Sequence, residues 1–148
     1  MTVHQLIYVS AAKVSFSEAE LASLLLKARE NNRRLGVSGL LIHESGSFFQ
    51  VLEGGEPVVE TLFQRIERDR RHERVVVLHR GSRPAASFGD WSMGFVAGDR
   101  DELKRVPGFN DFFHSGFSNT NVLNAGTQAV TLAMAFREGR FHQFVDGR

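Results

Sequence analysis

Two stretches of the chain carry apolar residues at helical spacing, and short runs rich in β-branched and aromatic residues surround them. The helical stretches are residues 17–32 and 57–66. The strand candidates are residues 3–10, 37–42, 48–52, 74–79 and 91–96. The order is β-α-β-β-α-β-β, which predicts a ferredoxin-like α+β sheet with one added strand.

Local signals predict where the helices begin and end. Ser17 followed by Glu20 is typical of a capping box, and the first helix is expected to end near Asn32, before Gly36. Pro57 fits the first turn of the second helix. The spacer 43–47 predicts a short hairpin turn between two strands.

Residues 40–42 and 75–78 are continuously apolar, which predicts strands that are buried on both faces. The two helices would cover one face of the sheet. We expect helices over 101–106 and 120–137 to cover the other face. The predicted organisation is a domain over 1–97 and a helical extension over 98–148 that packs on the sheet and offers an oligomer or partner interface.

Composition excludes several classes of function. With no cysteine, the chain has no disulfide, zinc–thiolate site, iron–sulfur cluster or thiol nucleophile. The net charge of +1 gives no indication of nucleic acid as a partner. No apolar run is long enough for a membrane span, and no signal peptide is evident, so we expect a cytoplasmic protein without membrane contact. The six histidines are scattered, and no metal site is expected.

Three polar residues fall where the pattern calls for apolar ones. Gln50 lies in the middle of a strand, Asn32 extends the apolar stripe of the first helix, and Tyr8 lies inside the first strand. Each has an ordinary explanation: an edge or backbone-bonded glutamine, a helix cap, and a packing tyrosine. A buried amide without a partner costs about 1–3 kcal/mol, so a function for Gln50 and Asn32 stays open beside these explanations.

Two further features have the same double interpretation. Trp91 and Met93 are two apart on one strand and point to one face, which is ordinary for core packing. Residues 65–74 hold five arginines, three acids and a histidine, which is typical of a solvated helix end, although arginine also suits phosphates and carbonyl oxygens.

Taken together, these residues resemble the BLUF family of blue-light sensors using FAD. The spacing from Tyr8 to Asn32, Gln50 and Trp91 is similar to that family. Its motifs are matched at residues 6–8, 31–32, 36–41, 49–54, 69–72 and 91–93. The resemblance spans residues 3–97, and the tail is similar, more loosely, to the extension of short stand-alone members.

The resemblance implies a flavin site and a photoactive group of residues. Its implied flavin contacts are Asn31, Asn32, Gln50, Arg65, Asp69, Arg71 and His72. Its implied photoactive residues are Tyr8, Gln50, Trp91 and Met93. FAD is the expected cofactor, with FMN or riboflavin as substitutes because the ring is the part recognised. The implied signal is a light-driven rearrangement of the hydrogen bonds linking Tyr8, Gln50 and the flavin, with electron and proton transfer instead of a thiol adduct.

We therefore expect a photosensory flavoprotein without turnover, which signals to a downstream protein and forms a homo-oligomer. Two alternatives share the β-α-β-β-α-β order. An RNA-binding module would need basic and aromatic residues exposed on the sheet. An acylphosphatase-like hydrolase would need a nucleophile or base cluster that the sequence does not display.

Overall fold

A computed structural model describes residues 2–13, 17–44, 46–86 and 94–97, together with separate residues between 129 and 143. The predicted order of elements is confirmed. The elements are β1 (Val3–Ala12), α1 (Glu18–Leu35), β2 (Ser38–Glu44), β3 (Ser47–Gly54), α2 (Glu56–Glu67), β4 (His72–Arg83) and β5 (Gly94–Ala97).

The five strands form one sheet in the order β4-β1-β3-β2-β5. Strands β1, β2, β3 and β4 pair antiparallel, whereas β5 joins β2 in parallel at the far edge. This is the predicted ferredoxin-like arrangement with an added strand. Strands β1 and β3 lie at its centre, so the residues they carry are covered on both faces.

The capping box of α1 is confirmed, since the Ser17 hydroxyl accepts from the Glu20 backbone N–H and the Glu20 carboxylate accepts from the Ser17 backbone N–H. The helix continues to Leu35, about one turn past the predicted end at Asn32. Gly36 closes it with φ of 72°, a left-handed conformation that glycine adopts without strain. Asn32 is therefore an interior residue of the last turn and not the cap.

Other boundaries differ by a few residues. The predicted strand 74–79 is observed as His72–Arg83. Of the predicted strand 91–96, residues 94–96 belong to Gly94–Ala97, and residues 91–93 lie outside the described residues. The hairpin between β2 and β3 is tighter than the predicted spacer and contains Gly46, with φ of 75°. In α2, Pro57 occupies the first turn as expected.

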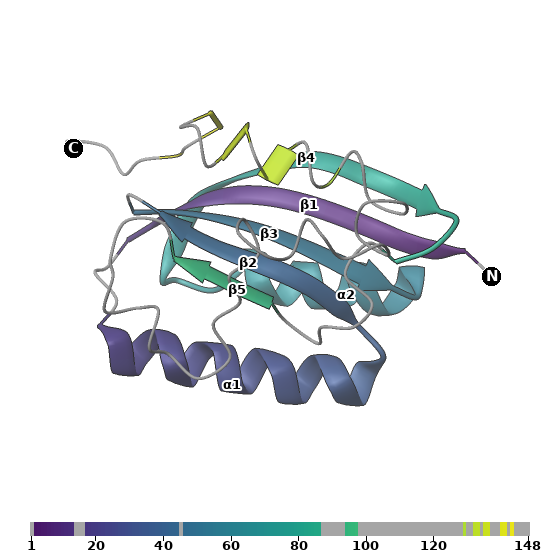
Figure 1. The fold of residues 1–148 in the computed structure, drawn as a ribbon, viewed down its shortest axis with the longest axis horizontal. Coiled ribbons are helices and arrows are strands. Elements are labelled where there is room, and N and C mark those ends of the chain that lie inside the picture. Colours follow the sequence, from purple (N-terminus) through teal and green to yellow (C-terminus); the bar gives the residue numbers. More distant parts are fainter. Residues whose placement is uncertain are drawn as a thin grey trace.

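The sheet separates two apolar cores. Helices α1 and α2 cover one face (Figure 1). On that face Leu21, Leu25, Val59 and Phe63 pack against β1 and β3. On the other face, three tail residues pack against apolar side chains of β1, β2 and β3. The tail residues are Ala129, Ala133 and Phe136. The expected cover by the tail is therefore observed for these residues.

The tail makes two specific contacts with β3. The ring of Phe136 packs on Phe49 with centroids 5.4 Å apart. The Ser47 hydroxyl donates to the backbone carbonyl of Gln143 at 2.8 Å and accepts from its N–H at 3.1 Å. The C-terminal segment is thus attached where β3 begins.

The expectation that β4 is covered on both faces is wrong for two of its residues. Val76 and Val77 are 42% and 37% exposed. Strand β4 lies at the edge of the sheet and has two register shifts against β1, so part of its apolar run faces solvent. Residues 40–42 of β2 are buried, as predicted.

No helix among the described residues is both long and apolar enough to cross a lipid bilayer. The predicted helix 101–106, most of the predicted helix 120–137, and both Trp91 and Met93 lie outside the described residues.

Candidate functional site

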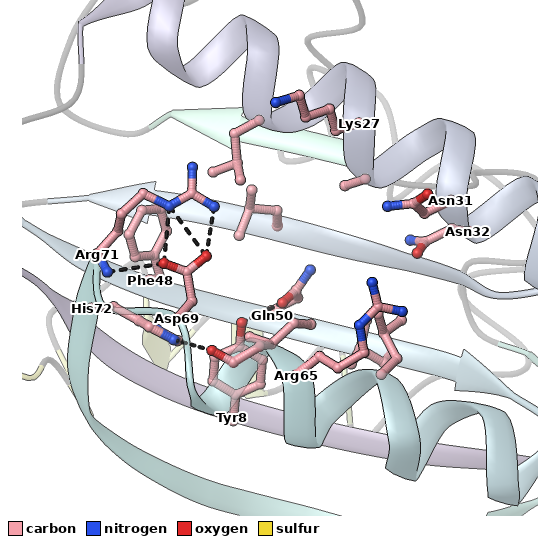
Figure 2. Close-up of a pocket in the computed structure, with 16 residues that line it drawn as sticks. Tyr8, Lys27, Asn31, Asn32, Phe48, Gln50, Arg65, Asp69, Arg71 and His72 are labelled. Atoms are coloured by element: carbon pink, nitrogen blue, oxygen red, sulfur yellow. Dashed lines mark hydrogen bonds and ion pairs between the residues drawn. The ribbon is translucent and has the colours of Figure 1, made fainter.

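A cavity of about 340 Å³ opens between α1, α2 and the sheet (Figure 2). Its volume lies in the range of small-molecule sites. Apolar side chains form most of its walls; they are Leu24, Ala28, Leu41, Phe48, Leu52, Leu62 and Ile66. Its polar lining consists of Tyr8, Lys27, Asn31, Asn32, Gln50, Arg65, Asp69, Arg71 and His72.

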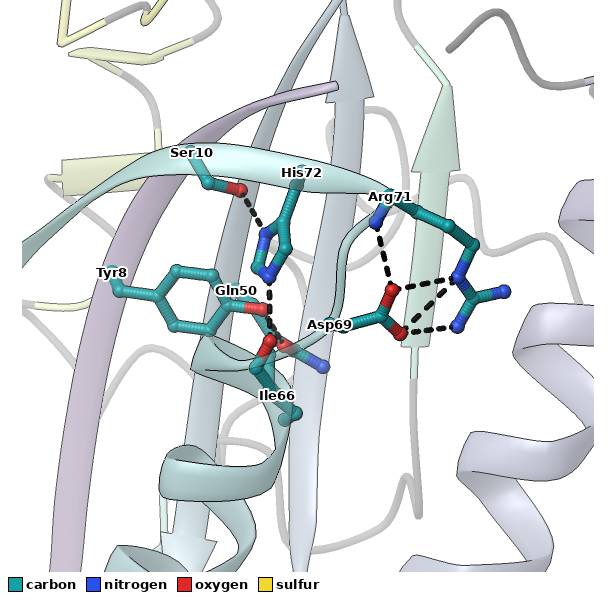
Figure 3. A network of polar contacts seen from close by, with 7 residues as sticks. All are labelled: Tyr8, Ser10, Gln50, Ile66, Asp69, Arg71 and His72. Atoms are coloured by element: carbon teal, nitrogen blue, oxygen red, sulfur yellow. Dashed lines mark hydrogen bonds and ion pairs between the residues drawn. The ribbon is translucent and has the colours of Figure 1, made fainter. Parts of the chain in front are cut away.

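Tyr8 and Gln50 form the floor of this cavity. They are direct partners in the β1–β3 ladder, so both side chains project from the same face of the sheet. The Tyr8 hydroxyl donates a hydrogen bond to Gln50 Oε1, and both residues are buried (Figure 3). The amide nitrogen of Gln50 is directed away from the phenol, toward the space between the helices (Figure 2).

Packing holds the Tyr8 ring in place. The Phe63 ring lies 5.4 Å from it, and the His72 ring meets it edge-on at 6.2 Å. Burial, and secondly the negative charge of Asp69, raise the pKa of the phenol far above its ordinary value. The hydroxyl therefore stays protonated at physiological pH and donates a hydrogen bond to Gln50.

We expect Tyr8 not to ionise near pH 10, its ordinary pKa. It is the only tyrosine in the chain, so tyrosinate absorbance reports on it alone. The raised pKa adds stability that is present below pH 10 and is lost as the pH rises through the folded-state pKa. An alkaline titration followed by tyrosinate absorbance and circular dichroism should show both changing together. Tyrosinate formed near pH 10 in a protein that keeps its circular dichroism would contradict the burial of the phenol.

The last two turns of α1 supply two neighbouring amides. Asn32 is buried, whereas Asn31 is half-buried and its Oδ1 accepts from Arg34 Nη2 at 2.9 Å. An asparagine amide can donate to a carbonyl oxygen and accept from an adjacent N–H. Arg65 reaches the same end of the cavity from α2 and is exposed (Figure 2).

His72 bridges three elements with its two ring nitrogens. Nε2 lies 2.6 Å from the backbone carbonyl oxygen of Ile66, and Nδ1 lies 2.8 Å from the Ser10 hydroxyl. A carbonyl oxygen only accepts, so Nε2 carries a proton. Both nitrogens are engaged with the protein, and His72 ties the end of α2 to β1 beside the Tyr8 ring (Figure 3).

Asp69 and Arg71 form a bidentate ion pair at the opposite end of the cavity from the asparagines (Figure 2). Arg71 Nη2 and Nε lie 2.6 and 3.0 Å from the two carboxylate oxygens. Hydrogen bonding from the Arg71 side chain lowers the pKa of Asp69 to about 2. The carboxylate thus stays charged and fixes the direction of the guanidinium.

The structure brings together eight of the ten residues singled out in the sequence. Trp91 and Met93 lie outside the described residues. The apolar walls agree with the leucine, isoleucine and phenylalanine side chains expected between the two helices, whereas Lys27 was not singled out in the sequence. Lys27 precedes Asn31 by four residues, so the helical period places both on one face of α1, and that spacing was the available signal.

Comparison with known proteins identifies the family. The model of the BLUF family, described as sensors of blue light using FAD, matches residues 3–94, well over half of the chain. The chain belongs to the BLUF family. It is a BLUF blue-light sensor whose cofactor is FAD.

Relatives with known roles match a small part of their own length. The chain is 39% identical over 93 residues to photoactivated adenylate cyclase subunit alpha of Euglena gracilis, which is 62% of this chain and 9% of that protein. Subunit beta of the same organism is 44% identical over 73 residues, 49% of this chain and 8% of that protein. The chain therefore spans less than a tenth of these relatives.

Two solved structures match this chain almost from end to end. The dark state of BlrB, a BLUF protein, is 25% identical with a TM-score of 0.64, covering 88% of this chain and 96% of that one. The ground state of BlsA is 29% identical with a TM-score of 0.65, covering 97% of this chain and 91% of that one. These matches agree with the ferredoxin-like fold.

The cavity of this BLUF chain fits a flavin ring by the chemistry of its lining. The ring is a flat apolar body whose polar edge has carbonyl acceptors and an N–H donor. The apolar walls suit the body, and the amides of Asn31, Asn32 and Gln50 suit the edge. The RNA-binding alternative is not favoured, since the aromatic residue at the centre of the opposite sheet face, Phe49, is fully buried under the tail.

Proposed function

We propose that Tyr8 and Gln50 are the light-switched pair of this sensor. The observation that carries the proposal is the buried hydrogen bond from the Tyr8 hydroxyl to Gln50 Oε1 on the floor of the flavin-sized cavity. Bound FAD supplies the absorption of blue light. The protein supplies a phenol that can give up a proton and an amide that can accept it.

The switch that we propose is a reversal of the Gln50 amide. In the arrangement described, the amide oxygen faces Tyr8 and the amide nitrogen faces the cavity. Rotation or tautomerisation exchanges donor and acceptor, so the phenol would meet a donor in place of an acceptor. Each arrangement presents a different hydrogen-bonding group to the cofactor site, which is the basis for two spectrally distinct states.

The remaining residues hold the cofactor or support those that do. Asn31, Asn32 and Arg65 are proposed to bind the polar edge of the ring, because all three lie at one end of the cavity. We assign His72 a supporting role, since both its nitrogens already have protein partners. Trp91 and Met93 stay proposed as relay residues beside Gln50.

The decisive experiment is the absorption spectrum of the purified protein before and after blue light. We expect a yellow protein that releases FAD on denaturation and shows a reversible red shift on illumination. A colourless protein that cannot be loaded with FAD would refute the cofactor site. A yellow protein with no shift would refute the switch alone.

Asn32→Ala should weaken FAD binding more than Arg65→Ala. Asn32 is 2% exposed, so its loss leaves a polar ring edge without a partner inside the cavity, at a cost of about 1–3 kcal/mol. Arg65 is exposed, so water can replace its hydrogen bond to the ring edge, and the loss should cost less than about 1 kcal/mol. Titration of each apoprotein with FAD measures the order, with thermal unfolding as the control for stability. The reverse order would place the ring edge elsewhere.

We propose that this chain passes on the light signal by a change in a protein–protein interaction and not by catalysing a reaction. Residues 1–97 would sense light, and residues 98–148 would pass the change to a separate partner or to a second copy of the chain. The contacts of Phe136 and Gln143 with β3 support this division. Light scattering of the dark and the illuminated protein measures whether light changes the oligomeric state. An unchanged mass would mean that the signal goes to a different protein and not to a second copy of the chain.

A further inference from the structure

In the part of the chain that the structure describes, the end of the cavity away from the asparagines has more basic than acidic side chains. Lys27 lines the cavity, is exposed, and forms no hydrogen bond or ion pair with any residue that the structure describes. Asp69 is the acidic residue lining the cavity, and its carboxylate is taken up by Arg71. Among the residues that the structure describes, no acid is left to compensate the charge of Lys27 at this end of the cavity.

Arg71 adds a second donor that faces the same helix. Its Nε and Nη2 bind Asp69, and Nη1 makes no hydrogen bond within the described part of the chain. Its guanidinium extends toward α1, the helix that carries Lys27 (Figures 2 and 3). Asp69 holds the guanidinium by two parallel bonds, so Nη1 is oriented before any ligand binds.

We propose that Lys27 Nζ and Arg71 Nη1 form a phosphoryl subsite, which makes this protein select phosphorylated flavins over riboflavin. The inference rests on the proposed flavin site. A ring whose polar edge meets Asn31 and Asn32 leaves the Lys27 end for the rest of the ligand. An ammonium from one wall and an aligned guanidinium from the other suit a phosphoryl group, which is a multivalent acceptor.

Lys27 and Arg71 would not strengthen the binding of riboflavin, because riboflavin has no phosphoryl group. Recognition of the ring alone would give riboflavin, FMN and FAD equal affinity, and that is the competing expectation. Because Lys27 is exposed, the contribution of its charge should be modest and should fall as salt screens it. We expect Lys27 to account for about a fivefold preference for FMN over riboflavin at low ionic strength.

The test is the affinity of riboflavin, FMN and FAD for the full-chain apoprotein in the dark, by fluorescence quenching at low and high salt. The variant is Lys27→Gln, with Lys27→Arg as the conservative replacement. Arg33→Gln is the matched control, since it removes one exposed charge from the same helix outside the cavity.

We expect the unmodified protein to prefer FMN and FAD over riboflavin. Lys27→Gln should largely remove this preference, whereas Lys27→Arg and Arg33→Gln should retain it. Inorganic phosphate should reduce the preference by competition. Equal affinities for the three flavins in the unmodified protein, or a preference unchanged by Lys27→Gln, would overturn the subsite while leaving the flavin site standing. Failure of all three flavins to bind, riboflavin included, would instead refute the proposed function on which the subsite rests.

Discussion

The Tyr8→Phe protein is expected to bind FAD and to show no reversible light-induced spectral shift. The substitution keeps the ring that packs on Phe63 and removes only the hydroxyl that donates to Gln50. No second tyrosine exists in the chain to replace it. Without the phenol proton, the Gln50 amide loses the partner that distinguishes its two arrangements. Light-minus-dark difference spectra of the purified variant measure the result.

Gln50→Leu is the matched variant for the other half of the pair. It keeps most of the side-chain volume and removes the amide, so the protein should again be yellow and lack the reversible shift. Both variants need a bound flavin and an unchanged circular dichroism spectrum as controls. A normal reversible shift in Tyr8→Phe would disprove the role of the phenol, even with fold and cofactor site intact.

Gly39→Ala should destabilise the fold by about 3 kcal/mol or more. A Cβ at Gly39 would lie 1.9 Å from the carbonyl oxygen of Val51 and 3.0 Å from its carbonyl carbon. Both atoms belong to the backbone of the adjacent central strand, so a side-chain rotation cannot relieve the contact. Strand β2 or β3 would have to move, and β3 carries Gln50. Chemical denaturation of the apoprotein measures the change.

Gly55→Ala is the matched control, because a Cβ there meets nothing within 4 Å. Gly55 caps α2 without a side-chain bond, so the replacement should cost less than about 1 kcal/mol. Equal stability losses for the two variants would contradict the close approach of β2 to β3 as the cause, since replacing glycine by alanine by itself lowers the entropy of the unfolded chain.

The order and type of the elements could be predicted because the periodic signals are local. The capping box at Ser17 and the glycine at position 36 are each decided by a few neighbouring residues. The position of a strand within the sheet is not local. The apolar run of β4 looks like that of a central strand, yet Val76 and Val77 face solvent because β4 is at the edge.

The same distinction applies to the site. Tyr8, Asn32 and Gln50 could be found as polar residues in apolar surroundings, and family spacing grouped them. The engagement of His72 with Ser10 and Ile66, and that of Arg71 with Asp69, depend on how α2 meets β4. Lys27 was missed because an exposed lysine on a helix is ordinary in sequence, and only the facing wall of the cavity gives it meaning.

The packing of Phe136 on Phe49 has a mechanical consequence. Phe49 and Gln50 are consecutive, so one peptide unit carries a cavity residue on one side of the sheet and a tail contact on the other. That unit belongs to two separately packed layers, and a torsional change in it has to be accommodated in both. Strand β3 thus connects the cavity and the tail contact directly, through two adjacent side chains on opposite faces of the sheet.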